Sequence, residues 1–72
     1  MSLAWQDDLE LALLLSEKYP GTDPLSVRFK ELHRWVTELP EFEDNPKTSN
    51  EGVLEAIQMA WYEEYVVRKE LD

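Results

Sequence analysis

The sequence predicts a small, mainly helical domain of three helices with at most one very short strand. Three stretches with helically spaced apolar residues, 8–18, 30–39 and 50–69, are separated by segments rich in proline and polar residues. The 72-residue chain is close to the smallest size that a hydrophobic core alone can hold folded, and 43% of its residues are apolar. We therefore expect residues 1–72 to form a single domain.

The first predicted helix covers residues 8–18, in which leucines recur at helical spacing. Asp7 or Asp8 could cap its start and interact favourably with its positive end. A helix that is apolar around most of its circumference is either well buried or leaves a patch for a partner. The residues that widen the apolar surface in this way are Leu9, Ala12 and Leu13.

The second predicted helix covers residues 30–39 and follows a turn that contains Asp23 and Pro24. Its apolar residues step by three and four positions, as expected for a helix with one buried face. The preceding segment, residues 25–29, is short and partly β-branched. It could form either a brief strand or the first turn of this helix, and the residues leave that choice open.

The third predicted helix covers residues 50–69. Thr48 and Glu51 have the spacing of a capping box, although either residue between them could also cap the helix. The segment 65–67 is more apolar than an exposed helix end needs to be. We expect it to pack against the additional leucines of the first helix.

The loop before the third helix, residues 39–51, is acidic and contains two prolines, which exclude a helix or strand interior. Phe42 stands alone among carboxylates, and we expect its ring to pin the loop to the core. Glu41, Glu43 and Asp44 would then face water. Such carboxylates could hold a divalent cation such as ferrous iron weakly, or could form a solvated acidic face without a resident ion.

The sequence carries a formal net charge of −9 at pH 7. This charge repels nucleic-acid phosphates and favours cations or a basic protein partner. A small basic segment contains Arg28, Lys30 and Arg34, and the segments on both sides are acidic. These cations could face DNA in a helix-turn-helix or winged-helix variant, but the surrounding negative charge argues against that function. We expect them to pair with nearby acids instead.

The sequence lacks the residues that several classes of function require. The absence of cysteine excludes disulfides, thiolate metal sites and cysteine catalysis. The one histidine, His33, is expected to be a partly exposed helix residue, with a ligand or proton carrier as the alternative. No serine has a nucleophile-elbow or triad context, so we expect no enzymatic activity. No apolar run approaches the ~20 residues of a membrane helix, and we expect a soluble cytoplasmic protein.

Several short motifs follow one another over some sixty residues of the chain. They are Leu3-x-Trp5, Tyr19-Pro20-x-x-Asp23-Pro24, Val27-Arg28-Phe29, His33-x-Trp35, Leu39-x-x-Phe42-x-Asp44-x-Pro46, Ser49-Asn50-Glu51, Leu54-Glu55-Ala56-Ile57 and Trp61. On these motifs the chain, from Leu3 to about Glu64, resembles the IscX (YfhJ) family. Members of this family are small acidic proteins of bacterial iron–sulfur cluster assembly.

The resemblance implies a modified winged-helix domain of three helices that does not bind DNA, with a core over residues 3–64 and a helical extension over 65–72. It implies a non-enzymatic adaptor or regulator that binds the cysteine desulfurase IscS through an acidic surface. There the protein would compete with a frataxin-type protein and tune sulfur delivery to the scaffold IscU. The resemblance also implies weak binding of ferrous iron by surface carboxylates, without a tightly bound cofactor.

Carried onto this sequence, the resemblance places the candidate iron ligands at Glu41, Glu43 and Asp44, with Glu38 and Glu51 at the margins of the site. The expected partner-binding residues are Glu38, Glu41, Glu43, Asp44, Glu51 and Glu55. Asn45 stands where the family often has an acid, which removes one potential iron ligand. The alternative functions are a winged-helix DNA-binding protein and a general protein-interaction module.

Overall fold

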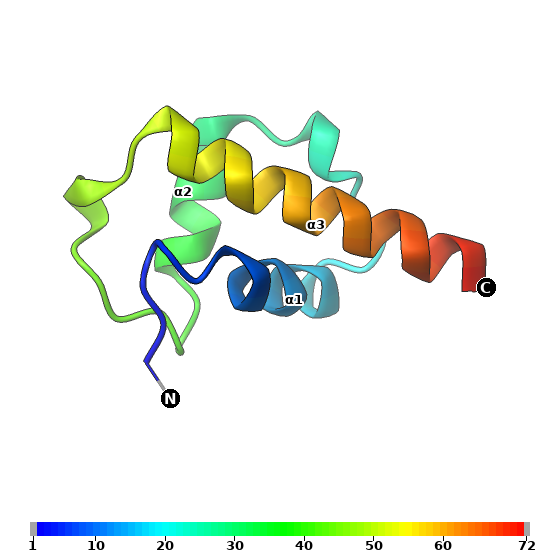
Figure 1. The fold of residues 1–72 in the computed structure, drawn as a ribbon, viewed down its shortest axis with the longest axis horizontal. Coiled ribbons are helices and arrows are strands. Elements are labelled where there is room, and N and C mark those ends of the chain that lie inside the picture. The colour runs from blue at the N-terminus through cyan, green and yellow to red at the C-terminus, as the bar shows by residue number, and fades with distance from the viewer. Residues whose placement is uncertain (1, 72) are drawn as a thin grey trace.

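The computed structural model describes residues 2–71, which fold mainly into three α-helices (Figure 1). The helices are α1 (Asp8–Lys18), α2 (Phe29–Thr37) and α3 (Glu51–Leu71), and two short 3-10 turns are η1 (Pro24–Ser26) and η2 (Pro46–Thr48). Within the described residues, β structure is limited to one parallel bridge between Leu3 and Phe42. The prediction of a mainly helical domain with three helices is confirmed.

The hydrophobic core lies where the three helices meet, with α3 running alongside α1 and across one end of α2 (Figure 1). Each helix contributes two fully buried residues that are four positions apart, which places both on one helix face. These residues are Leu11 and Leu15 in α1, Leu32 and Val36 in α2, and Ile57 and Trp61 in α3. The periodic apolar pattern of the sequence therefore marks the core directly.

The helix boundaries follow the prediction closely, and α1 matches it at both ends. The undecided segment, residues 25–29, forms neither a strand nor a full helical turn. Its first residues lie in η1, where the Asp23 carboxylate accepts from the N–H of Leu25 at 3.0 Å. The backbone is then extended until α2 begins at Phe29. The Gln58 side chain of α3 fixes this connection by donating to the Pro24 carbonyl at 3.0 Å.

Two predicted helix caps differ from the structure. Asn50 precedes α3 and caps it, because its side-chain oxygen accepts from the N–H of Val53 at 2.9 Å; the alternative of a cap between Thr48 and Glu51 is therefore confirmed. The capping box of Thr48 and Glu51 is therefore wrong, because Thr48 belongs to η2. Asp7 does precede α1, but its carboxylate accepts from the N–H of Ala4 at 2.8 Å instead of capping the helix.

The predicted packing of the α3 tail against the additional α1 leucines is also wrong. Leu9 is 64% exposed, Leu13 is 41% exposed and Val67 is 50% exposed. The tail of α3 extends beyond the core, as its free end in Figure 1 shows. Leu9 and Leu13 thus form part of the accessible surface.

The N-terminal segment and the acidic loop are joined by a cluster that we call the Trp5 clasp, formed by Trp5, His33 and Phe42. The Trp5 indole Nε1–H donates to the Asn45 carbonyl at 2.8 Å, and the Trp5 backbone N–H donates to the Asp44 carboxylate at 3.2 Å. Its ring stacks on His33 with centroids 5.2 Å apart and meets Phe42 edge-on at 4.7 Å. Phe42 is buried, so the prediction that it pins the loop is confirmed.

Further hydrogen bonds connect the acidic loop to the N-terminal segment and to α2. The Leu3 N–H donates to the Glu41 carbonyl, and the Leu3 carbonyl accepts from the Glu43 N–H, both at 2.8 Å. His33 Nε2–H donates to the Pro46 carbonyl at 2.6 Å. His33 is half-buried in this position and acts as a structural clamp on the loop.

The Trp5 clasp generates a stability prediction. Trp5→Phe keeps most ring contacts but removes the Nε1–H donor, so we expect it to lower the free energy of unfolding by ~1 kcal/mol. Trp5→Ala also removes the buried ring and should cost about 3–5 kcal/mol. Urea denaturation measures both values. Because the loop loses its anchor, amide hydrogen exchange at residues 43–45 should accelerate more than exchange in α1.

Trp35→Phe is the matched control, because Trp35 is half-buried and stacks on Tyr19 with centroids 4.3 Å apart. This variant should lower stability without a selective effect on exchange at residues 43–45. Unchanged loop exchange in Trp5→Ala would contradict the assigned role of the clasp.

Candidate functional site

The six predicted partner-binding acids lie at the end of α2, in the following loop and at the start of α3. Glu38 follows the last turn of α2, and Glu51 and Glu55 occupy the first two turns of α3. The remaining three lie in the connecting loop, which passes around one end of the molecule from α2 to α3 (Figure 1). We call the set the acidic surface: Glu38, Glu41, Glu43, Asp44, Glu51 and Glu55. It is extended in shape.

The loop carboxylates differ in their exposure and in their hydrogen bonds. Glu43 is exposed, and Glu41 is half-buried beside α1. Asp44 is exposed, yet its two oxygens accept from the backbone N–H groups of Trp5 at 3.2 Å and Asn45 at 2.7 Å. The Asp44 carboxylate thus contributes negative charge to the surface while it also holds the loop in shape.

The structure does not assemble the acids into a compact metal centre. Within residues 2–71, no three side chains of the His, Cys, Asp or Glu type come close enough together to coordinate one ion. Carboxylate ligands bind divalent cations tightly only when several of them converge. The predicted iron ligands Glu41, Glu43 and Asp44 are neighbours in sequence, and iron binding there stays a prediction.

The basic segment does not neutralise the acidic surface. Arg28, Lys30 and Arg34 are all exposed, and none of them forms an ion pair in the described part of the chain. The prediction that they pair internally is therefore wrong. The ion pair that the described residues do contain joins Glu64 to Arg68 on α3, at 3.8 Å. Within the described residues, no ion pair engages the loop carboxylates.

A shallow groove adjoins the acidic surface on the side of α1. One hollow of about 280 Å³ has an apolar floor of Leu3, Leu13 and Leu14. A second hollow of about 340 Å³ continues it toward the turn of residues 39–41 and shares three lining residues with the first. We call the combined feature the α1 groove. Its charged lining consists of the carboxylates Glu10, Glu17 and Glu41 together with one cation, Lys18.

The α1 groove contains residues that the sequence analysis did not assign to a site. Glu10 and Glu17 are exposed carboxylates that lie on α1 and share the groove lining with Glu41. The excess of leucines in residues 8–18 could have indicated this feature. It predicted a helix that is either well buried or leaves an apolar patch accessible to a partner. The exposure of Leu13 shows that the second outcome applies.

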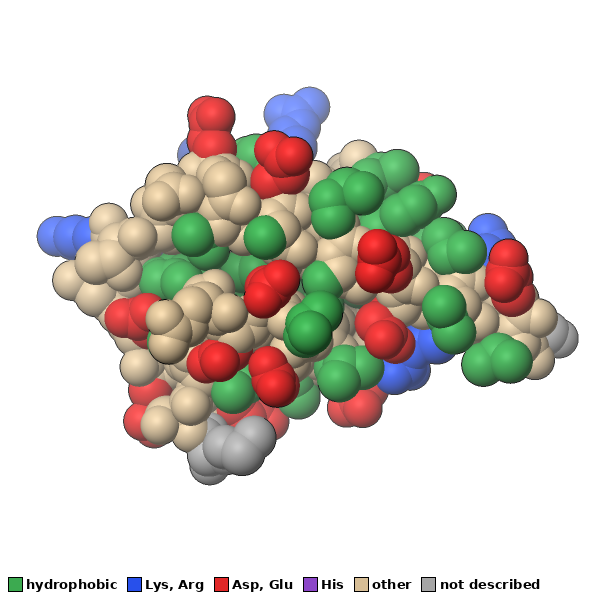
Figure 2. All heavy atoms as spheres, viewed as in Figure 1, with side chains coloured by type: hydrophobic (Ala, Val, Ile, Leu, Met, Phe, Trp, Pro, Cys, Tyr) green, Lys and Arg blue, Asp and Glu red, His purple; other side chains and the backbone are tan. Residues whose placement is uncertain are grey.

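The charge distribution is visible on the molecular surface. Figure 2 shows carboxylates spread over one face, with apolar side chains between them and the Lys and Arg side chains mainly at its edges. The longest helix, α3, has 21 residues, but no helix in the described range 2–71 is both long and apolar enough to span a bilayer. The accessible chemistry of this face is that of carboxylates around apolar patches.

Comparison with known proteins identifies relatives of the chain. A family model described as "Iron-sulphur cluster assembly" matches residues 3–66. An uncharacterized protein of Pseudomonas aeruginosa is 59% identical over 64 residues, which cover 89% of this chain and 97% of that protein. The matched range contains the Trp5 clasp, the acidic surface and the α1 groove. The chain therefore belongs to the Iron-sulphur cluster assembly family, which is the IscX (YfhJ) family, and its role lies in iron–sulfur cluster assembly.

Proposed function

We propose that this protein is a non-enzymatic adaptor that binds the cysteine desulfurase of iron–sulfur cluster assembly through its acidic surface. The observation that carries the proposal is the acidic surface itself: all its carboxylates except the half-buried Glu41 are exposed, and none forms an ion pair with a basic side chain of the described residues. A surface of this kind attracts a basic partner over long distances and raises the association rate. The family assignment supplies the process in which the partner acts.

The α1 groove extends the proposed interface beyond electrostatics. Its floor contains Leu13, which is 41% exposed, and Leu14, which is half-buried. Burying such side chains against a partner stabilises a complex by about 25 cal/mol for each Å² of apolar area. Charged rims mainly steer and orient a partner, whereas apolar contacts at the centre slow its dissociation. The groove therefore supplies an apolar contact beside the acidic surface.

The proposal requires no catalytic residue. The single histidine holds the Pro46 carbonyl, Glu43 is exposed, Glu41 is half-buried, and Asp44 accepts from backbone N–H groups. An adaptor acts by occupying a surface of the desulfurase, and in this way it would compete with a frataxin-type protein and alter delivery of sulfur to the scaffold IscU. We also propose that the protein acts in the cytoplasm. The negative surface argues against the alternative of DNA binding.

We also propose that ferrous iron associates weakly with the acidic surface near Glu41, Glu43 and Asp44. One or two carboxylates would coordinate the ion, and water would complete its coordination sphere. Bound iron would reduce the negative charge that the desulfurase meets. The ion would thereby act as a modulator of partner affinity and not as a resident cofactor.

The charge prediction uses two triple variants. Glu38→Lys, Glu43→Lys and Glu55→Lys together alter the acidic surface and should weaken desulfurase binding at least about tenfold at low salt. The control combines Glu31→Lys, Glu63→Lys and Glu70→Lys, which are exposed residues outside that surface. Each triple variant changes the net charge from −9 to −3, because every replacement adds two positive charges. Calorimetric titration at low and high salt measures both.

The control should retain most of the parent affinity, with a small loss from the reduced overall attraction. Equal weakening by the two triple variants would mean that net charge alone governs binding, and the proposed surface would be wrong. Unchanged binding in both would remove the desulfurase proposal.

The α1 groove gives a second prediction with a closely matched control. Leu13→Ser removes an apolar group from the groove floor and should accelerate dissociation from the desulfurase by about three- to tenfold. Leu9→Ser changes the same residue type on the same helix at a position that is 64% exposed and outside the groove. That variant should dissociate at the parent rate. Surface plasmon resonance measures both rates, and identical behaviour of the two variants would exclude the groove from the interface.

The iron prediction concerns location and effect. Under anaerobic conditions, Fe²⁺ should broaden the amide resonances of residues 41–44 more strongly than those beside Glu63 and Glu70, which are exposed acids on α3. The dissociation constant of the desulfurase complex should change when the same concentration of Fe²⁺ is present. Uniform broadening across all acidic positions would contradict a loop site, and an unchanged dissociation constant would contradict the modulator role.

A further inference from the structure

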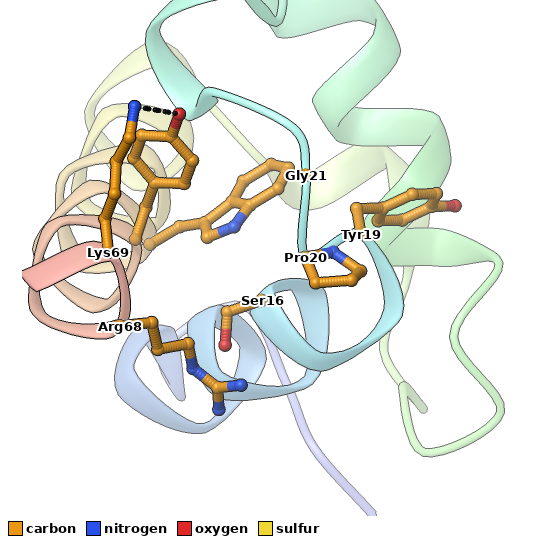
Figure 3. A pocket seen from close by; sticks show the side chains of 8 residues that line it. Ser16, Tyr19, Pro20, Gly21, Arg68 and Lys69 are labelled. Carbon is orange, nitrogen blue, oxygen red and sulfur yellow. Dashed lines mark hydrogen bonds between the residues drawn. The ribbon is translucent and has the colours of Figure 1, made fainter. Parts of the chain in front are cut away.

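A pocket that differs in charge from the rest of the molecule lies between α1 and the C-terminal half of α3 (Figure 3). It has a volume of about 320 Å³ and is lined by the end of α1, the turn at Pro20 and Gly21, and the last turns of α3. Two of its lining residues, Arg68 and Lys69, lie beyond residue 66, where the family match ends. The pocket therefore depends on the helical extension, which the family assignment leaves without a role.

The pocket is a cationic site in an acidic protein. Its lining includes Arg68 and Lys69 but no carboxylate, although the chain has 16 acidic and only 7 basic residues. Figure 3 shows Arg68 extending from α3 toward the side of α1 that carries Ser16. Arg68 Nε lies 3.8 Å from a Glu64 oxygen, which is too long for a good hydrogen bond. Most of the guanidinium donors thus remain free for a ligand.

A buried donor without a partner lines the same pocket. Trp61 is fully buried, and its Nε1–H is the buried side-chain polar group that finds no hydrogen-bond partner among the described residues. Buried polar groups in native proteins nearly always have a partner, so an orphaned one needs an explanation. An indole N–H can only donate. The missing partner must therefore be an acceptor.

The aromatic walls indicate what kind of acceptor fits. Tyr19 and Tyr65 line the pocket beside Trp61. Lys69 Nζ lies 3.4 Å from the Tyr65 hydroxyl oxygen and 5.3 Å from the Tyr65 ring centre, and the dashed line in Figure 3 marks the first of these contacts. The ammonium group is thus held at the mouth of an aromatic pocket. The volume is near the lower end for small-molecule sites, about 300–1,000 Å³.

From these features we propose that the pocket binds a small organic anion, with a phosphate or carboxylate head at Arg68 and an apolar body against the aromatic walls, while Lys69 borders the opposite side of the pocket. Oxygen atoms of such a ligand are acceptors and complement the donors of Arg68 and Trp61. The cationic pocket and the acidic surface then serve different ligands. The proposal does not depend on desulfurase binding.

The test follows the indole N–H resonance of Trp61 in ¹⁵N-labelled protein, assigned by its loss in Trp61→Phe. Phenyl phosphate and benzoate are the two probes, and sodium chloride at equal ionic strength is the reference. We expect at least one probe to shift the Trp61 resonance with saturation while the chloride reference does not. The probe that binds more tightly identifies the preferred head group.

Charge-removing variants show whether the response belongs to the pocket. Arg68→Gln should raise the dissociation constant of the active probe about tenfold, as expected for loss of a charged hydrogen-bond donor. Lys30→Gln and Arg34→Gln remove exposed cations of α2 and should leave it unchanged. A Trp61 resonance insensitive to both probes would overturn the proposal. So would a shift that chloride reproduces, or one that Arg68→Gln leaves intact.

Discussion

The docking of the Trp5 side chain onto the acidic loop is the contact on which the proposed interface depends. The loop contains no regular helix apart from η2, and its carboxylates would repel one another if nothing fixed its backbone. Trp5 supplies a buried ring, an indole donor to Asn45 and a backbone donor to Asp44. His33 reaches the same loop from α2 and binds the Pro46 carbonyl. A negatively charged loop is thus held in one shape by hydrogen-bond donors and aromatic packing.

The fixed loop and the exposed leucines of α1 produce a surface with two components. The charges of Glu10, Glu17 and Glu41 surround an apolar floor, and the remaining acids continue along the loop to α3. Long-range attraction depends on the sum of these charges, whereas the shape of the groove restricts which partner segments fit. The cationic pocket at the end of α3 lies outside this surface and has the opposite charge. One small domain therefore presents two chemically distinct binding features.

Much of this architecture could be predicted from the sequence, because helical periodicity directly reports buried faces. Leu11 and Leu15 in α1 illustrate this, and Pro20 explains why the helix ends where predicted. The Trp5 clasp could not be derived in this way, since Trp5 and Asn45 are 40 positions apart and no periodic pattern joins them. The pocket at Arg68 could not be derived from the sequence either, because it depends on how α3 packs alongside α1. Local patterns predict elements, whereas contacts between distant segments require the fold.

The long sequence separation of the Trp5 contact has a consequence for how the molecule assembles. Helical segments form from contacts between near neighbours, but closure of a 40-residue loop carries a larger entropic cost and depends on helices that are already packed. The acidic loop should therefore be the last part to become ordered and the first to open. Release of the N-terminal segment would switch off docking while the helical body stayed intact. Recognition by a partner is in this sense coupled to completion of folding.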